Sequence, residues 1–448
     1  MIGKVWKKQG GTGGGSIVNA VIEQYKAETS TISANTFVEF VNHYIDNTLI
    51  NASTAYDYAS TTSAVLIDTN KVFIAHGDAN GFLKGIVCTI NNSTITTGTD
   101  TTIVGVLNSS YGTSAVLIDT NKVFIAHSSS GESGTLQGIV CTISDLTIST
   151  GGDTPLGTTS YSSYASAVKI STNKVFIAHD GGSSTRRLKG IVCTVSGTTI
   201  TKGSVSTLSN STGSSLYASA TLVGDNLVFI SHSNNNSDKK LNGTFCDIFG
   251  TTITANSNYS LSNISNSSYG MSVCIDQTNH KVFIAHRYGE YTNDGHLNGM
   301  ICTVVPNDTI TLETDVRLVL RSVSNISAIK IIDNKVFVAY GRTNYRLNGI
   351  VCTINNSTIS AGTSVTLNST NDSSYGTSAV LIDTNKVFIA HRSDSTNKYL
   401  NGMVINTPNT DITSDNKTIT ASTNKIDGVT KTEATTSTDG DVWVLDIN

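Results

Sequence analysis

The side chains with the most chemical potential in this sequence are histidines that return at one position of a repeat. Six of the nine histidines end a copy of the string KVFIAH or a near variant, and a tyrosine takes this place in a seventh copy: His76, His127, His179, His232, His286, His391 and Tyr340. Such a series could suggest a ring of metal ligands. Zinc, however, needs each ligand nitrogen about 2 Å away, whereas equivalent atoms in neighbouring sheets lie about 10 Å apart. We therefore expect no metal site and a structural role, with each ring bonding backbone or hydroxyl groups at a strand end.

The cysteines follow the same rule. Six of the seven share one repeat position, and Cys274 lies in a different strand of its repeat: Cys88, Cys141, Cys193, Cys246, Cys302 and Cys352. A disulfide needs Cα atoms within about 7 Å, so the same spacing excludes bridges between equivalent positions. We expect buried free thiols that pack as small apolar groups. The odd count and the lack of a CxxC motif indicate a protein made in a reducing cytoplasm.

Motifs of catalysis are missing from the sequence. GxSxG, HExxH, a P-loop and a dinucleotide-binding fingerprint do not occur in a usable context, and the stretch 11–15 has neither the lysine nor the helix of a phosphate cradle. The recurrent carboxylates Asp68, Asp119, Asp276 and Asp383 stand where turns are expected, and Asp favours turns because it bonds its own backbone. We expect no catalytic residues, no cofactor and no enzymatic activity.

Composition narrows the range of partners. Charged residues make up 14% of the chain, against roughly 25% in ordinary domains, and 29 basic against 33 acidic residues give a net charge of −4. A nucleic-acid binder would need a basic surface. The sequence contains no apolar run long enough to span a membrane, and Met1 is followed by a basic, glycine-rich stretch and not by the apolar core of a signal peptide. We expect neither nucleic acid nor membrane as a partner.

The segment that varies most between repeats follows the histidine position. Small residues fill it in the first two repeats, whereas later repeats carry arginine, lysine and tyrosine. Guanidinium groups pair with carboxylates or phosphates in a fork geometry, and tyrosine rings offer contact area at low entropic cost. We expect a ligand- or receptor-binding surface here, with solvated loops as the alternative; the candidate residues are Arg287, Tyr288, Tyr291, Arg342, Tyr345, Arg346, Arg392, Lys398 and Tyr399.

These side chains must be positioned by the repeat itself. Its central phenylalanines are spaced by 51, 52, 53, 54, 54 and 51 residues: Phe73, Phe124, Phe176, Phe229, Phe283, Phe337 and Phe388. Each unit shows an apolar run, an Asp/Asn turn, KVFIAH, the variable loop, Leu-x-Gly with a second apolar run, and a Thr-rich segment, which together predict four short strands. A four-stranded unit of about 50 residues is typical of a propeller blade. We predict an all-β fold, a seven-bladed β-propeller of four-stranded blades with small β elements at both termini. An open solenoid is disfavoured because no capping repeat is visible.

The ends of the chain predict how the ring closes. The seventh repeat loses its pattern at Thr407-Pro408, and the segment Ile45–Asn51 resembles a fourth strand placed just before the first repeat. We expect this segment to pair with the seventh blade. The predicted domains are 1–53 (N-terminal arm, β attachment element and latch strand), 54–406 (propeller) and 407–448 (C-terminal β element). The flanks are interpreted either as β-hairpins that cover the propeller edge or as a small attachment domain.

A resemblance to a known class adds a functional expectation. The flanking segments Ser30–Val41 and Lys425–Val429, the repeated unit and the Asn-, Ser- and Thr-rich composition make the chain similar to tail-associated propeller proteins of phages and phage-tail-like bacteriocins. These belong to the receptor-binding or tail-fibre type and act on Gram-positive, low-GC bacteria. The resemblance implies a virion or tail-particle component that recognises the host surface, assembled in the bacterial cytoplasm and released by lysis.

The implied partners are a host surface glycan or surface protein at the loop face, and other phage tail or baseplate proteins at the terminal segments, with multiple copies per particle. Two alternatives stay open. One is a structural baseplate or decoration subunit whose propeller contacts only other particle proteins. The other is a cellular lectin-like or scaffold propeller.

Overall fold

The structure is a computed structural model, and it describes two units of the chain. Side chains are described within 62–406, apart from 79, 92–93, 130–133, 158–164, 182–186, 210–216, 234–239, 263–269, 290–294, 307–308, 321–322, 343–344, 369–370, 372, 385 and 393–398; nearer the termini only strand backbones are described. Contacts group Ile45–Asp411 into one unit, and Met1–Tyr44 with Ile412–Asn448 into the other.

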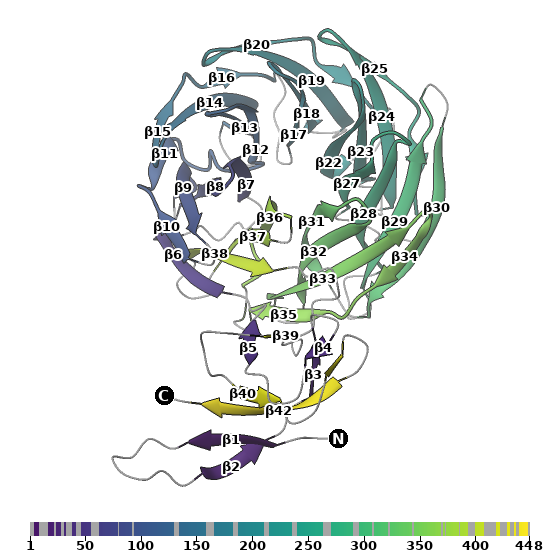
Figure 1. The fold of residues 1–448 in the computed structure, drawn as a ribbon. Coiled ribbons are helices and arrows are strands. Elements are labelled where there is room, and N and C mark those ends of the chain that lie inside the picture. The colour runs from purple at the N-terminus through teal and green to yellow at the C-terminus, as the bar shows by residue number, and fades with distance from the viewer. Residues whose placement is uncertain are drawn as a thin grey trace. The chain divides into compact units, whose positions relative to one another are not determined.

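Ile45–Asp411 forms a β-propeller of seven blades, which confirms the predicted fold (Figure 1). The innermost strands are β7 (Ser63–Asp68), β12 (Ser114–Asp119), β17 (Ser166–Ser171), β22 (Ser215–Gly224), β27 (Met271–Asp276), β31 (Ser324–Ile332) and β36 (Ser378–Asp383). The second strands hold the KVFIAH copies: β8 (Lys71–Gly77), β13 (Lys122–Ser128), β18 (Lys174–Gly181), β23 (Leu227–Asn234), β28 (Lys281–Tyr288), β32 (Lys335–Arg342) and β37 (Lys386–Arg392).

The third and outer strands complete each blade. The third strands are β9 (Leu83–Asn91), β14 (Leu136–Ser144), β19 (Arg187–Ser196), β24 (Leu241–Phe249), β29 (His296–Val304), β33 (Arg346–Asn355) and β38 (Tyr399–Asn406). In five blades the outer strand consists of two pieces on the same neighbour: β10 (Thr94–Thr97) with β11 (Thr101–Val104), β15 (Thr147–Thr150) with β16 (Thr154–Pro155), β20 (Thr199–Lys202) with β21 (Ser206–Thr207), β25 (Thr252–Ala255) with β26 (Tyr259–Ser260), and β34 (Thr358–Ala361) with β35 (Val365–Asn368). Blade 5 has one long outer strand, β30 (Ile310–Val319).

The second strand of each blade is buried on both of its faces, which explains its apolar sequence. All seven predicted core phenylalanines are fully buried. The Leu-x-Gly motif is explained by the same ring: a Cβ added at Gly138 would lie 3.1 Å from the Phe124 ring and 2.8 Å from Leu156. A side chain at this position would force the buried Phe124 ring or the Leu156 side chain to shift, which favours glycine beneath the phenylalanine.

Neighbouring blades share their cores. One apolar cluster joins Phe73 of blade 1 to Val123 and Cys141 of blade 2, and another joins Val72 and Cys88 of blade 1 to blade 7. The repeated cysteines thus pack between blades as apolar groups. All seven cysteines of the chain are free thiols, as predicted; six are buried and Cys274 is half-buried.

Serines at the start of the innermost strands link the blades around the axis. The amide of Ala115 donates to Ser63 Oγ at 3.0 Å, and equivalent bonds recur between further neighbours. The same bond closes the ring, because the Ala64 amide donates to Ser378 Oγ of blade 7 at 2.9 Å. Closure therefore rests on both a shared core and a repeated polar contact.

Blade 7 receives its outer strand from the other end of the chain. Strand β6 (Asp46–Thr54) pairs antiparallel with β38, with Gly402 opposite Thr48. Figure 1 shows β6 in purple beside the yellow-green β38. This is the pairing expected of a latch strand.

The terminal unit combines strands from both ends of the chain. Its larger sheet has the order β2 (Ile17–Val21), β1 (Lys4–Lys8), β42 (Asp439–Asp446), β3 (Gln24–Ala27), β39 (Thr418–Ala421) and β5 (Val38–Val41), with β40 (Gly428–Thr430) beside β42. A second pair is formed by β4 (Thr31–Ile32) and β41 (Ala434–Thr435). The flanks, expected as separate β elements, thus share one sheet, and the contact boundaries fall at 44/45 and 411/412, compared with the predicted 53/54 and 406/407.

Candidate functional site

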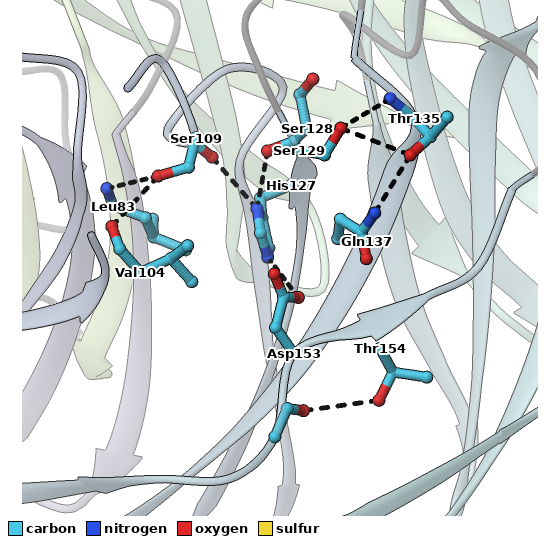
Figure 2. A network of polar contacts seen from close by, with 11 residues as sticks. Leu83, Val104, Ser109, His127, Ser128, Ser129, Thr135, Gln137, Asp153 and Thr154 are labelled. Atoms are coloured by element: carbon cyan, nitrogen blue, oxygen red, sulfur yellow. Dashed lines mark hydrogen bonds and ion pairs between the residues drawn. The ribbon is translucent and has the colours of Figure 1, made fainter. Parts of the chain in front are cut away.

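The repeated histidines lie inside the blades, where their ring nitrogens meet polar groups. His127 Nδ1 lies 2.9 Å from the Ser128 carbonyl and 3.1 Å from that of Ser109, and Nε2 lies 3.1 Å from Asp153 Oδ1 (Figure 2). None of the six rings is more than 1% exposed. The predicted backbone contacts are present, but the recurrent carboxylate was not predicted.

The partner of the histidine comes from the middle of the outer strand, at the break between its two pieces or, in blade 5, from within the unbroken strand β30. Nε2 faces an oxygen of this segment in four blades, at 3.0 Å from Asp100, 3.1 Å from Asp153, 2.9 Å from Asn258 and 3.1 Å from Asp315. In blade 6 the Tyr340 hydroxyl bonds Ser364 in the same way. The sequence holds a signal for this contact, since Asp100 and Asp153 each stand two residues after a glycine, in the turn that breaks the outer strand.

Blade 3 departs from this pattern. Val205 stands where blades 1, 2, 4 and 5 have Asp or Asn and blade 6 has Ser364, and His179 Nε2 has no hydrogen-bond partner among the described residues. Burial lowers the pKa of His179 to about 4, and it also lowers those of His232 and His391 to about 4. Burial raises the pKa of the Cys88 thiol to about 12, which keeps it protonated and unreactive. These groups are therefore part of the scaffold.

The recurrent turn carboxylates also have the predicted role. The amides that follow Asp68, Asp119 and Asp383 donate to their carboxylates at 2.7, 2.8 and 2.7 Å. Hydrogen bonds from Thr120 and Lys122 lower the pKa of the Asp119 carboxyl. Within the described residues no three metal-binding side chains are grouped, and no helix there is long and apolar enough to cross a membrane.

The strand order places the variable loops on one face of the propeller. Consecutive strands of a blade are antiparallel, so the second strand ends beside the start of the innermost strand. The loops between second and third strands therefore lie on the same face as the links into the next blade. We call this the loop face. Backbone bonds join the two kinds of segment: the Ser374 amide donates to the Tyr345 carbonyl at 2.8 Å, and Ser110 bonds Gly81 in the same way at 3.0 Å.

Aromatic and basic side chains gather on the loop face at the junction of blades 6 and 7. The rings of Tyr345 and Tyr375 have their centroids 4.9 Å apart, and the Arg392 guanidinium lies 4.5 Å from the Tyr375 centroid. Arg346 Nε donates to Asn371 Oδ1 at 3.2 Å. Tyr345 is 43% exposed. The site is an exposed Tyr345 ring that packs against Tyr375, whose own ring is contacted by Arg392.

Arginines flank this tyrosine. Arg342 ends β32 and Arg346 begins β33, and the two are direct cross-strand partners. Like charges at such positions repel each other, so an anion bound between them would be favoured. Arg346 is exposed and Arg342 is half-buried.

The other predicted site residues are spread more widely. Arg287 and Arg392 are 3% and 6% exposed, so their side chains are not surface groups as the loop interpretation expects. Both directly follow the histidine in the second strand, and because that strand is buried on both of its faces, the side chain that points away from the histidine is covered as well. Tyr288 is half-buried at the end of β28 and Tyr399, which begins β38, is 38% exposed. Tyr291 and Lys398 lie outside the described residues.

A pocket opens at the axis on the same face. It has a volume of about 320 Å³ and is lined by residues from all seven blades, at or just before the start of each innermost strand. None of the described residues that line it carries a charged side chain. The pocket was not predicted, because it exists only when the ring is closed.

Comparison with known proteins shows the fold alone. No protein family matches the sequence, and no curated protein does. The BP39L lectin from Burkholderia pseudomallei is 12% identical, with 80% of this chain and 98% of the lectin aligned at a TM-score of 0.61. A PL25 ulvan lyase, a polysaccharide lyase, is 9% identical, with 82% of this chain and 96% of the lyase aligned at a TM-score of 0.54. By fold, the chain is similar to both a carbohydrate-binding protein and a carbohydrate-cleaving enzyme.

Proposed function

We propose that this protein is a non-enzymatic, glycan-binding propeller that recognises an acidic surface glycan at the junction of blades 6 and 7. The observation that carries the proposal is the exposed ring of Tyr345 between Arg342 and Arg346. Tyrosine presents a flat apolar surface to the C–H face of a sugar, and a pair of guanidinium groups suits a carboxylate or phosphate.

The backbone of Tyr345 supports a binding role. Its φ is 52°, in the left-handed region, whereas the equivalent residue of blade 1 is Gly81 with φ 71°. A bulky residue in this conformation costs roughly 1–2 kcal/mol compared with glycine. Backbone strain of this kind gathers at ligand sites, and here it holds a tyrosine against its Tyr375 support before any ligand binds.

Binding without catalysis is supported by the state of the histidines. The six repeated rings are buried in the blades, and three have pKa values of about 4. Rings buried in this way are not available as general bases for a bound saccharide. Both structural neighbours have names that refer to carbohydrate, which agrees with a glycan ligand but does not choose between lectin and lyase.

For the cellular setting of the protein we keep the expectation that follows from its resemblance to tail-associated propeller proteins of phages and phage-tail-like bacteriocins. We propose that the protein is displayed on a phage or phage-tail-like particle, with the terminal unit as the attachment element to tail or baseplate proteins. Support comes from the division of the chain into two units, because strands from both ends of the chain share one sheet in the unit formed by Met1–Tyr44 and Ile412–Asn448. Detection of the protein in purified particles tests this setting; its absence would favour the cellular lectin-like alternative.

The test of glycan binding is an array of acidic and neutral glycans probed with the parent and with Tyr345→Ala/Arg346→Ala. We expect the double variant to lose at least about tenfold in affinity for acidic glycans, as for hot-spot residues. Phe82→Ala is the matched control, because Phe82 takes the place of Arg346 in blade 1; it should bind like the parent. Equal binding by the double variant, or products released from a glycan, would overturn the proposal.

A further inference from the structure

The axial pocket is a second binding site, separate from the arginine-rich junction. We propose that it holds one neutral sugar unit, of one or two rings, with Tyr217 as the stacking residue. The inference rests on the proposed glycan-binding function but concerns a different site and a different, uncharged ligand. The volume of the axial pocket, about 320 Å³, lies at the lower end of the range for small-molecule sites, roughly 300–1,000 Å³.

The described lining of the pocket combines apolar side chains with hydroxyl groups. Its larger apolar side chains are Tyr217, Met271 and Ile326, from blades 4, 5 and 6. Every blade except blade 5 contributes a serine near the start of its innermost strand, and blades 7, 1 and 2 each add a threonine just before that serine. A sugar ring has an apolar C–H face and hydroxyl groups at its edge, so it can contact both kinds of lining group. A charged ligand finds no countercharge among the described lining residues.

The serine hydroxyls retain capacity for a ligand. Ser63, Ser114 and Ser378 each accept an amide hydrogen from the next blade at 2.9–3.0 Å. This bond uses an oxygen lone pair, and a hydroxyl also carries one O–H donor and a second lone pair. The blade-to-blade bonds fix each oxygen in place, so the hydroxyls are already ordered before a ligand enters.

The backbone at the mouth of the pocket provides an independent observation. The residue two places before Ser114, Ser219, Ser327 and Ser378 is left-handed: Gly112 (φ 61°), Tyr217 (φ 55°), Asn325 (φ 48°) and Gly376 (φ 61°). Glycine and asparagine accept this conformation readily, but a tyrosine does so only at a cost. Among the described residues that line the pocket, Tyr217 is also the one aromatic residue. A strained backbone at an aromatic residue that lines a pocket points to contact between that residue and a ligand.

Because the native repeats offer glycine at this position, stability and binding can be separated. Tyr217→Gly introduces the glycine that blades 2 and 7 have at this position, Gly112 and Gly376. The variant should therefore fold and melt at the temperature of the parent or above. Asn226→Gly is the matched control, because it also replaces a left-handed residue of blade 4 by glycine, but in the β22–β23 turn on the opposite face of the propeller. Ala165→Phe fills the pocket from blade 3, where Ala165 is part of the lining.

The probes are D-glucose, D-galactose, N-acetylglucosamine, L-fucose and L-rhamnose, each titrated calorimetrically. We expect at least one probe to bind the parent with one site per chain. Tyr217→Gly should weaken this binding by roughly tenfold or more, Ala165→Phe should abolish it, and Asn226→Gly should leave it unchanged. Three results would each overturn the inference: no binding of any probe, equal binding by Tyr217→Gly, or a lower melting temperature for Tyr217→Gly, which would make Tyr217 a structural residue.

The two sites fail independently. If Tyr345→Ala/Arg346→Ala removes binding to acidic glycans while no neutral sugar enters the pocket, the proposed function stands and the axial site is wrong. If neutral sugars bind in a Tyr217-dependent manner and the junction variant changes nothing, the axial site stands and the junction is wrong.

Discussion

A single substitution in blade 3 tests whether the polar contact inside each blade is understood. Blade 1 combines His76, Lys84 and Asp100, with Asp100 bonding both His76 Nε2 at 3.0 Å and Lys84 Nζ at 3.3 Å. Blade 3 has the histidine and the lysine in the same register, with His179 opposite Lys189. Val205, 39% exposed, stands in place of the aspartate. Val205→Asp therefore supplies the missing member of a group that blade 1 already contains.

The backbone needed for this exchange is already present. In blade 1 the Gly98 amide donates to the Val87 carbonyl at 2.8 Å, and in blade 3 the Gly203 amide donates to Val192 at 2.8 Å. Position 205 thus follows the same turn as position 100. A hydrogen bond to a charged group contributes about 1.5–3 kcal/mol, and an unsatisfied buried group costs about 1–3 kcal/mol. We expect Val205→Asp to raise the free energy of unfolding by roughly 1–3 kcal/mol near neutral pH.

The measurement is urea unfolding of the parent, Val205→Asp, Val205→Asn and the reverse exchange Asp153→Val in blade 2. The first two variants should gain stability, with Asn gaining less, and Asp153→Val should lose a similar amount. The carboxylate should also raise the pKa of His179 from about 4, which NMR titration of the imidazole carbon would record. If Val205→Asp gains no stability and His179 titrates as before, the carboxylate does not reach the ring and the reasoning is refuted.

The remaining predictions concern acid, the core and the latch. Burial lowers the folded-state pKa of His179, His232 and His391 to about 4, below the unfolded value of 6.5, so the unfolded state binds more protons between these two pH values. The free energy of unfolding, measured by urea unfolding at several pH values, should therefore fall as the pH falls through this window, by up to roughly 3 kcal/mol per ring. Phe124→Ala should cost about 3–5 kcal/mol by transfer and cavity terms, and an unchanged melting temperature would show that Phe124 is not a core residue. Deleting 1–54 should destabilise the propeller by exposing the edge of β38, whereas deleting 1–44, which keeps β6, should not; equal melting of the two would show that β6 is not needed.

The fold was predictable because the same local sequence pattern occurs in each of the seven repeats. Strand runs, Asp/Asn turns and the spacing of the phenylalanines each indicate one blade, and their number indicates closure. The strand-like pattern of Ile45–Asn51 and its position just before repeat 1 were sufficient to predict that it pairs with the seventh blade. The reason for Leu-x-Gly was not visible in the sequence, because the contact between Gly138 and the Phe124 ring joins two strands across the sheet.

The site was predictable only in part, for a related reason. The sequence shows that arginine and tyrosine follow the histidine, and Tyr345 and Arg346 are indeed exposed. It does not show that Arg392 lies over the ring of Tyr375, a residue from the preceding link, and is thereby covered. The strands also extend past the histidine by one or two residues, so that side chains expected in loops take inward strand positions.

The distribution of left-handed residues separates the two faces of the propeller. On the face opposite the loops, the described turns place Asp145, Gly197, Asn226, Gly250, His280 and Asn356 at positive φ, all of them types that tolerate this conformation or are enriched in it. On the loop face two tyrosines, Tyr217 and Tyr345, occupy positions at which other blades have glycine. Turn geometry alone requires no tyrosine there, since Gly376 and Gly81 make the same turns without strain. The cost of both side chains is therefore best explained by what their rings contact on the loop face, and that contact is what the junction and pocket variants measure.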